Sequence, residues 1–195
     1  MLVVVSGPSA AGKTTLCRRL LRDRADIVYS ISCTTRLPRG REVDGREYHF
    51  LDRASFERKI AEGGFLEHAN VHGFYYGTPK DRVLSALSRG ASVLMDIDVQ
   101  GVAQIRSLAA DAPPHDLLKE SFVDVFVAPP SMDVLRERLV ARGEDTPEAM
   151  ERRLKNALVE MDEAGRFKYV IVNDEVGSAY RQLQSILDRE GGRDG

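Results

Sequence analysis

Short apolar runs separated by turn residues recur along the chain. The first, 2–5, stops at a Ser-Gly pair, and similar runs cover 92–97, 123–128 and 170–172. Apolar runs of this length are typical of strands buried on both faces of a sheet. The segment 27–32 instead alternates apolar and polar residues, as a half-buried strand does. We therefore predict five strands at these positions.

Helical patterns lie between these runs, with apolar residues three or four positions apart. The Thr78-Pro79 pair predicts the start of one such helix, with Thr78 as the N-cap, Pro79 in the first helical position and the end at Gly90. Further helices are predicted at 13–22, 55–62, 99–108, 132–141, 147–164 and 179–188.

The order of these elements defines a fold class. Strands that alternate with helices indicate an α/β protein with a mostly parallel sheet covered on both faces. Segment 33–80 does not follow this alternation, because its short strands and turns look mixed. We therefore predict a core from 1–32 and 81–195 and an inserted lobe from 33–80. The proline-containing segment 109–120 has no assigned role.

Composition limits the possible functions. The chain has 195 residues, which fits one compact domain with small inserted lobes. It carries 28 basic and 30 acidic residues, and this balance argues against a dedicated nucleic-acid binder. The apolar runs are too short for a membrane span, and the first residues lack the basic region of a signal peptide. The two cysteines form no C-x-x-C pair, so we expect a reducing compartment, the cytoplasm. A monomer or small homo-oligomer is expected, but the sequence does not determine which.

The segment after the first strand matches the pattern G-x-x-x-x-G-K-[ST] without a mismatch. It lies between a predicted strand and a predicted helix, which is the context that this phosphate-binding motif requires. The glycines allow a tight loop whose N–H groups face an anion, and the helix start adds its positive dipole end. The ordinary alternative is a glycine turn, but the complete motif favours a bound nucleoside triphosphate. The expected ATP-binding residues here are Gly7, Pro8, Ser9, Ala10, Ala11, Gly12, Lys13, Thr14 and Thr15.

Two side chains of this loop would carry its chemistry. The Lys13 ammonium can reach the β and γ phosphates, and the Thr14 hydroxyl can hold Mg²⁺. We therefore expect Mg²⁺ as the cofactor, bound by Thr14 together with the phosphates of ATP.

Four arginines fall within eleven residues of a chain that is acidic overall: Arg36, Arg39, Arg41 and Arg46. Arginine suits bidentate recognition of phosphate, so the cluster can be a site for a second anion. It can equally be a solvated basic loop, and this segment alone leaves both interpretations open.

Several longer motifs are more specific. Segment 30–39 reads S-I-S-C-T-T-R-L-P-R and segment 42–50 reads E-V-D-G-R-E-Y-H-F, and both resemble the guanylate kinase family. Further matching motifs, in the same order, lie at 65–67, 75–78, 94–101, 129–131, 138–139, 142–143 and 172–174. The resemblance covers essentially the whole chain.

This resemblance implies transfer of the γ-phosphoryl group of ATP to GMP, giving ADP and GDP. It implies a P-loop kinase fold, a three-layer sandwich with an inserted GMP-binding lobe and a helical lid at about 136–153. The implied GMP-binding residues are Ser32, Arg36, Arg39, Tyr48, Glu67, Tyr76, Thr78, Asp96 and Asp98. The implied ATP-binding residues beyond the loop are Arg138 and Asn173. The implied catalytic residues are Lys13, Arg36, Arg39, Arg142 and Arg153.

The chemistry of the residues agrees with these roles. Guanine presents two adjacent donors, N1–H and the 2-amino group, and the ionised carboxylate of Glu67 can accept from both. Adenine would leave such a carboxylate partly unpaired, which gives strong discrimination. No dedicated base is required, because the acceptor phosphate has a second pKa near 6 and its oxygen is already a nucleophile at pH 7. Without the surrounding motifs, Glu67 would read as a surface carboxylate.

Some positions depart from the commonest family pattern. Ala10 stands where a third loop glycine is frequent, Cys33 where a polar residue is common, and Thr78 where serine is usual. Cys17 is expected to be a small apolar filler. A metal site at Glu67, His68 and His72 is disfavoured, because the segment should be extended and offers no further strong ligand.

Three other functions share some of these features. A non-catalytic guanylate-kinase-like interaction module would usually lack the phosphate loop, which is intact here. A kinase for a phosphorylated sugar shares the loop but does not need Glu67. A GTPase switch needs an N-K-x-D motif, which the sequence lacks.

Overall fold

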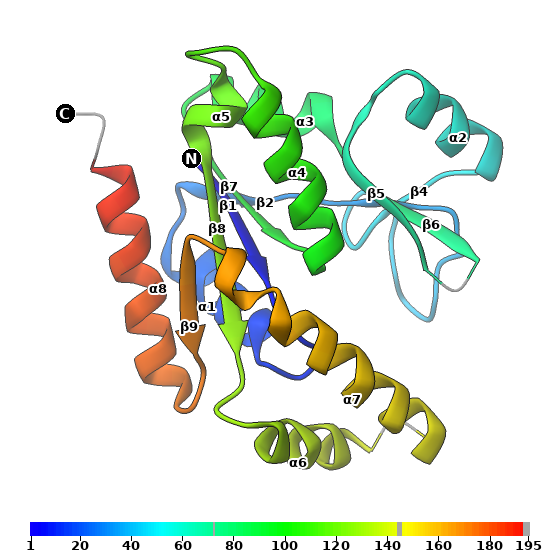
Figure 1. Ribbon diagram of the computed structural model, residues 1–195. Coiled ribbons are helices and arrows are strands. Elements are labelled where there is room, and N and C mark those ends of the chain that lie inside the picture. The colour runs from blue at the N-terminus through cyan, green and yellow to red at the C-terminus, as the bar shows by residue number, and fades with distance from the viewer. Residues whose placement is uncertain (72, 144–145, 193–195) are drawn as a thin grey trace.

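A five-stranded parallel sheet forms the centre of the molecule (Figure 1). The computed structural model describes residues 1–71, 73–143 and 146–192, and of Arg142 only the backbone. The strands are ordered β2-β7-β1-β8-β9, and all of their pairings are parallel. Their bounds are Leu2–Ser6 for β1, Ile27–Tyr29 for β2, Ser92–Asp96 for β7, Phe122–Ala128 for β8 and Tyr169–Val172 for β9. The predicted α/β class with a mostly parallel sheet is confirmed.

Helices cover both faces of this sheet because β1 is apolar on both sides. Val3 and Val5 pack with α1 (Lys13–Asp23) and α8 (Val176–Gly191). Leu2 and Val4 pack on the other face with α3 (Lys80–Ser88) and α4 (Val99–Asp111). The short helix α5 (Leu117–Ser121) adds Leu118 to this second layer. Within the described residues, no helix is both long and apolar enough to span a bilayer.

A second sheet stands to one side of the first (Figure 1). Its order is β4-β3-β6-β5, and it is mixed, because β3 pairs parallel with β4 and antiparallel with β6. A separate small core of Cys33, Phe56 and Phe65 supports it. We call residues 33–79 the lobe. Its elements are β3 (Cys33–Thr34), β4 (His49–Phe50), α2 (Arg53–Ala61), β5 (Phe65–Val71) and β6 (Phe74–Pro79).

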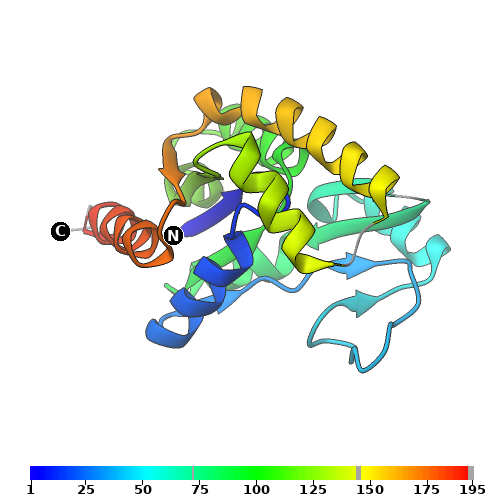
Figure 2. The same ribbon diagram turned by 90° about the horizontal axis from the view of Figure 1, so that it is seen from below.

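Two helices, α6 (Met132–Arg142) and α7 (Pro147–Asp162), lie side by side (Figure 2). Thr146 begins α7 as its N-cap, accepting a hydrogen bond from the Ala149 N–H, and Pro147 follows in the first turn. The pair shares its own apolar cluster, which also contains Ala10 of the glycine loop. We call α6 and α7 the helical hairpin. A single turn of 3-10 helix, Ala164–Arg166, leads back to the central sheet.

The prediction of a helix start at Thr78-Pro79 was wrong. Strand β6 continues through Pro79, and α3 begins at Lys80 with Pro79 as its N-cap. The Thr78 hydroxyl does not cap a helix, because it donates a hydrogen bond to Glu67. Capping preferences describe an isolated helix end, and here a buried cross-strand partner determines the use of the hydroxyl.

The prediction for 27–32 was also too long. Only Ile27–Tyr29 forms a strand, and both Val28 and Tyr29 are exposed. β2 is an edge strand, so its outer positions have no neighbouring strand to cover them. Helix α5 was not predicted, because its five residues show no helical period.

Buried Asp124 on β8 should stabilise the core measurably. Its carboxylate accepts hydrogen bonds from the Arg106 guanidinium of α4 and from the Lys168 N–H at 2.8 Å. Asp124→Ala leaves these donors unpaired, so we expect the free energy of unfolding to fall by about 3 kcal/mol in urea titrations. The control Asp162→Ala, at an exposed position on α7, should change it by less than about 0.5 kcal/mol. Equal stability of the two variants would contradict this assignment.

Candidate functional site

The glycine loop is held so closely by its neighbours that two of its positions exclude any side chain. At Gly7, with φ +132°, a Cβ would lie 2.2 Å from the Val127 carbonyl oxygen. At Gly12, with φ +100°, a Cβ would lie 2.1 Å from the Asn173 amide nitrogen. Both residues therefore must be glycine, for conformational and for steric reasons.

Lys13 and Thr14 begin α1 directly beside this loop. The Lys13 ammonium donates hydrogen bonds to the carbonyl oxygens of Gly7 and, at 3.1 Å, of Pro8, so the charge lies within the loop. The Thr14 hydroxyl donates to the Asp96 carboxylate at 3.4 Å. Burial raises the pKa of Asp96, and the neighbouring Lys13 charge and Thr14 hydroxyl oppose that shift. These groups line a cavity of about 500 Å³.

Side chains from distant segments hold the loop in place. The Asn173 amide donates to the Ala11 carbonyl at 2.7 Å, and Arg138 of α6 donates to the Asn173 carbonyl at 2.9 Å. Arg153 of α7 donates to the Ser9 hydroxyl at 2.9 Å. Asn173, Arg138 and Arg153 therefore lie together at the loop. The side chain of Arg142 lies outside the described residues.

Two further residues of this cavity had no signal in any sequence motif. Tyr29 lines it from the end of β2, and Glu160 lines it from α7. Burial raises the pKa of Glu160, whereas the Lys13 charge lowers it. Glu160 follows Arg153 by seven residues, two helical turns, so both lie on the face of α7 that meets the loop. That seven-residue spacing is the sequence signal that could have placed Glu160 near the loop.

A second cavity, of about 320 Å³, lies against the lobe. Glu67 of β5 lines it and is only 7% exposed. Thr78, directly opposite on β6, donates its hydroxyl proton to Glu67 Oε1 at 2.6 Å. The Ser32 hydroxyl lies 3.5 Å from that of Thr78 and also faces the cavity. The structure therefore brings Ser32, Thr78 and Glu67 together, with Thr78 orienting the carboxylate.

The environment of Glu67 makes its ionisation sensitive to neutral pH. Burial and, to a smaller extent, the negative charge of Asp98 raise its pKa to about 7, although the hydrogen bonds from Thr78 oppose the shift. A ligand that donates hydrogen bonds to this buried carboxylate would stabilise its ionised form, because little water reaches it.

Arg36 is almost buried, at 6% exposure, and its guanidinium is already engaged. It donates two hydrogen bonds to Glu42, at 2.6 and 2.7 Å, and packs over the rings of Tyr48 and Phe50. This pairing, together with a hydrogen bond from the Arg39 N–H, lowers the pKa of Glu42 to about 2. Sequence motifs alone did not single out Glu42, although its i+6 position in the same loop made a contact possible.

The other proposed phosphate ligands divide into two groups. Tyr48 and Tyr76 lie edge to face, with ring centroids 5.9 Å apart, and both line the second cavity. Arg39 is exposed on the loop, where its backbone N–H donates to Glu42 at 2.8 Å, and its side chain lines neither of the two cavities.

The two cavities are neighbours with a common wall. Tyr48, Asp96, Ile97 and Asp98 line both of them. Asp98 also begins α4, because its carboxylate accepts a hydrogen bond from the Gly101 N–H at 2.8 Å. A ligand in the loop cavity and a ligand in the lobe cavity would therefore meet at this wall.

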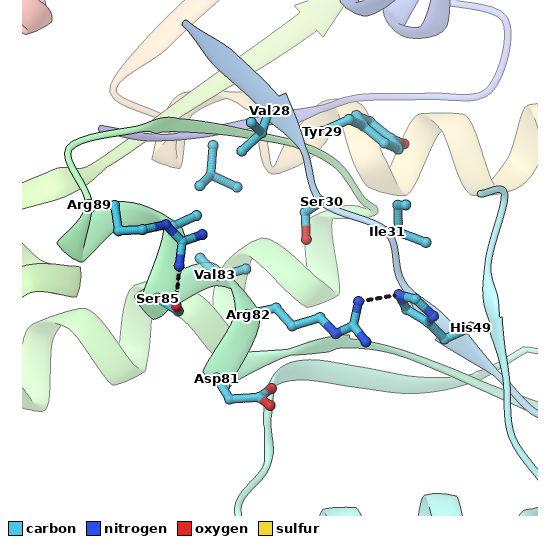
Figure 3. A pocket seen from close by; sticks show the side chains of 12 residues that line it. Val28, Tyr29, Ser30, Ile31, His49, Asp81, Arg82, Val83, Ser85 and Arg89 are labelled. Carbon is cyan, nitrogen blue, oxygen red and sulfur yellow. Dashed lines mark hydrogen bonds between the residues drawn. The ribbon is translucent and has the colours of Figure 1, made fainter. Parts of the chain in front are cut away.

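A third cavity, of about 560 Å³, lies between β2, β4 and α3 and shares Tyr29 with the loop cavity (Figure 3). Arg82 of α3 points across it and donates to His49 of β4 at 2.8 Å. Burial and the Arg82 charge lower the pKa of His49, which keeps the ring neutral as an acceptor. This bond links the lobe to the core.

The loop cavity offers oxygen ligands rather than a closed metal cage. In the described part of the chain, no group of three or more His, Cys, Asp or Glu residues could hold a metal, and His72 lies outside that part. The Thr14 hydroxyl and the Asp96 carboxylate are hard oxygen donors, which fits Mg²⁺ shared with phosphates.

The fold and the loop together define a P-loop nucleotide-binding protein. Its marks here are a buried parallel strand, a glycine loop with the lysine inside it, and a helix that starts at the loop. The lobe and the helical hairpin are additions to that core. The family model described as Guanylate kinase matches residues 1–190.

Relatives agree over nearly the whole chain. The guanylate kinase of Clostridium perfringens (strain 13 / Type A) is 44% identical over 187 residues, covering 96% of this chain and 82% of that protein. That of Symbiobacterium thermophilum is 46% identical over 193 residues, covering 99% and 87%. A crystal structure of guanylate kinase from Anaplasma phagocytophilum superposes with a TM-score of 0.72 at 32% identity, covering 97% and 85%. This chain belongs to the guanylate kinase family.

The raised pKa of Glu67 predicts a pH dependence. If Glu67 binds a guanine base, its carboxylate must be ionised, so protonation below pH 7 would compete with binding. We expect the dissociation constant for GMP, measured by calorimetry, to rise more than about tenfold between pH 8 and pH 5.5. Glu67→Gln, in which the GMP phosphate titrates as before, serves as the control and should show a much shallower rise. Parallel pH profiles for the two proteins would contradict a titrating Glu67.

Proposed function

We propose that this protein transfers the γ-phosphoryl group of ATP to GMP, giving ADP and GDP. The observation that carries the proposal is the common wall between the two cavities. Lys13 lies in the first cavity and Glu67 in the second, and Asp96 and Asp98 face both. A triphosphate in the loop and a guanine monophosphate against the lobe would meet with their phosphates facing each other.

On the ATP side, the loop N–H groups and Lys13 would hold the phosphates. Mg²⁺, held by Thr14 with the phosphates, would neutralise charge on the transferred group. Arg153 and Arg138 are already placed at the loop by their bonds to Ser9 and Asn173. We propose that Arg142, from the end of α6, completes this cationic set.

On the GMP side, Glu67 would accept N1–H and the 2-amino group of guanine. Ser32 is the hydroxyl donor available for the guanine O6, because the Thr78 proton is given to Glu67. Arg36, Tyr48 and Tyr76 would hold the acceptor phosphate, and Arg39 would reach it from the exposed loop. Glu42 would keep the Arg36 guanidinium oriented, and the remaining N–H groups of that guanidinium would bind the phosphate.

The reaction needs positioning rather than proton removal. An oxygen of the GMP phosphate attacks the γ-phosphorus, and the bond to the β–γ bridging oxygen breaks, leaving ADP. The GMP phosphate is largely deprotonated at pH 7, so no side chain has to act as a base. The cations reduce the repulsion between two polyanions, and closure of the helical hairpin would exclude water.

A substrate panel tests the proposal. Purified protein with ATP and Mg²⁺ is given GMP, AMP, UMP, CMP or dTMP, and diphosphate formation is scored by chromatography. We expect GDP to form at least about a hundredfold faster than any other diphosphate, because the other bases do not present two donors to Glu67. Equal rates for all acceptors, or ATP hydrolysis without GDP, would refute the proposal.

Removal of the loop lysine should stop catalysis without unfolding the protein. Lys13→Ala should lower kcat by at least about a thousandfold in a coupled ADP assay, because the γ-phosphoryl charge loses its main side-chain cation. Its circular dichroism should be unchanged, since the ammonium is bonded to loop carbonyls and is not part of the core. The exposed Lys155→Ala on α7 is the matched control.

Arg39 can be tested against its neighbour. If Arg39 reaches the acceptor phosphate, Arg39→Ala should raise the KM for GMP about tenfold and leave the KM for ATP unchanged. Arg41, exposed two residues along the same loop, is the control. If both variants have the same GMP kinetics, Arg39 does not bind the acceptor phosphate and belongs to a solvated basic loop.

We also propose that the reaction takes place in the cytoplasm. The two cysteines, Cys17 and Cys33, are both buried free thiols. Burial raises the pKa of each thiol, so both are protonated at neutral pH. These properties are consistent with a reducing compartment.

A further inference from the structure

The strand that carries Glu67 has an open edge within its own sheet. β5 is the last strand in the order β4-β3-β6-β5, so only one side of it is paired to another strand. Backbone groups on its other side need partners elsewhere when they are not in water. Helix α4 of the core packs against this side.

One side chain of α4 provides those partners. The Gln104 carboxamide accepts a hydrogen bond from the His68 N–H at 3.1 Å and donates one to the His68 carbonyl at 3.0 Å. A carboxamide has the same donor and acceptor pair as a peptide group, so Gln104 acts as a one-residue substitute for the missing neighbouring strand. His68 directly follows Glu67, so the bonds act beside the carboxylate-bearing residue.

The same face of α4 also limits where the carboxylate can go. Gly101, one turn before Gln104, would place a Cβ 3.1 Å from Glu67 Oε2 and 3.3 Å from its Cγ. The helix therefore touches Glu67 through a position without a side chain and holds the adjacent backbone through Gln104. Asp98 begins this helix at the wall between the two cavities.

We propose that Gln104 is a positioning residue for guanine recognition. It fixes β5 against α4, so that Glu67 stands at the depth and angle where both carboxylate oxygens can accept from guanine. Without it, Leu66 of β5 still packs with Val102 and Ile105 of α4, but the backbone at His68 loses both of its partners and can shift beside Glu67. This proposal rests on the proposed function, because it assumes that Glu67 reads the base.

Gln104→Met tests this role, since methionine has similar length and volume but cannot form either hydrogen bond. We expect kcat/KM for GMP to fall about tenfold, mainly through KM, with the KM for ATP unchanged. The ratio of kcat/KM for GMP to that for IMP, which keeps N1–H but lacks the 2-amino group, should fall in parallel. Gln104→Glu keeps the acceptor for the His68 N–H and loses the donor, so its ratio should be intermediate.

Two controls separate positioning from general loss of stability. Gln182→Met makes the same change at an exposed position on α8 and should leave all constants unchanged. Arg106→Met lies two residues further along α4, on another side of the helix, and removes the bond to Asp124, so it should lower Tm while keeping the GMP to IMP ratio. A ratio that falls as much in Arg106→Met as in Gln104→Met overturns the proposal.

The outcome also distinguishes this inference from the function on which it rests. If Glu67→Gln leaves the GMP to IMP ratio unchanged, the assignment of Glu67 as the base reader fails. If Glu67→Gln lowers the ratio and neither Gln104 variant does, only the positioning role fails. Should Gln104→Met not fold, Gln104→Glu decides, because an unchanged ratio in that variant also overturns the proposal.

Discussion

The close approach of the glycine loop to its neighbours is the constraint on which the site depends. The Val127 carbonyl and the Asn173 amide leave no room for a Cβ at Gly7 or Gly12. The loop is therefore set by β8 on one side and by the end of β9 on the other, both parts of the rigid central sheet. The loop in turn fixes the positions of Lys13 and Thr14, which follow it directly. Asp96 is held in place because β7 pairs with β1.

Acidic side chains line the loop cavity together with Lys13, namely Asp96, Asp98 and Glu160, and Glu67 lies in the neighbouring cavity. Burial raises the pKa values of Asp96, Glu160 and Glu67, and the Lys13 charge opposes the shift at the first two. Such an arrangement attracts cations and ligands rich in N–H donors, and it repels phosphate unless a cation accompanies it. Under the proposed function, the phosphates of ATP would therefore depend on Mg²⁺ and arginines, and the carboxylate of Glu67 would favour a base that offers N–H donors.

Much of the core could be predicted from the sequence because its signals are local. The apolar run of β1 and the complete loop motif beside it need no distant information. The limits of prediction appear where one side chain has two possible partners. Thr78 precedes a proline in the pattern of a helix cap, but it pairs with a residue eleven positions away. Gln104 and Asp124 make contacts between elements that are distant in sequence, so no periodicity or motif could identify them. The contact of Glu42 with Arg36 is within one loop, but it depends on how that loop folds. The placement of Arg39 depends on a loop whose conformation local residue preferences do not determine.

Ala10 has a consequence for how the molecule can move. Its backbone lies in the left-handed region, with φ +67°, where glycine would be unstrained. Its methyl group, which glycine lacks, is part of the apolar cluster of the helical hairpin with Leu135 and Leu139. Alanine is therefore strained at this position, but its methyl group packs the glycine loop against the helical hairpin. Any rotation of the hairpin must either carry the loop backbone with it or expose that methyl group, so the two cannot rearrange independently.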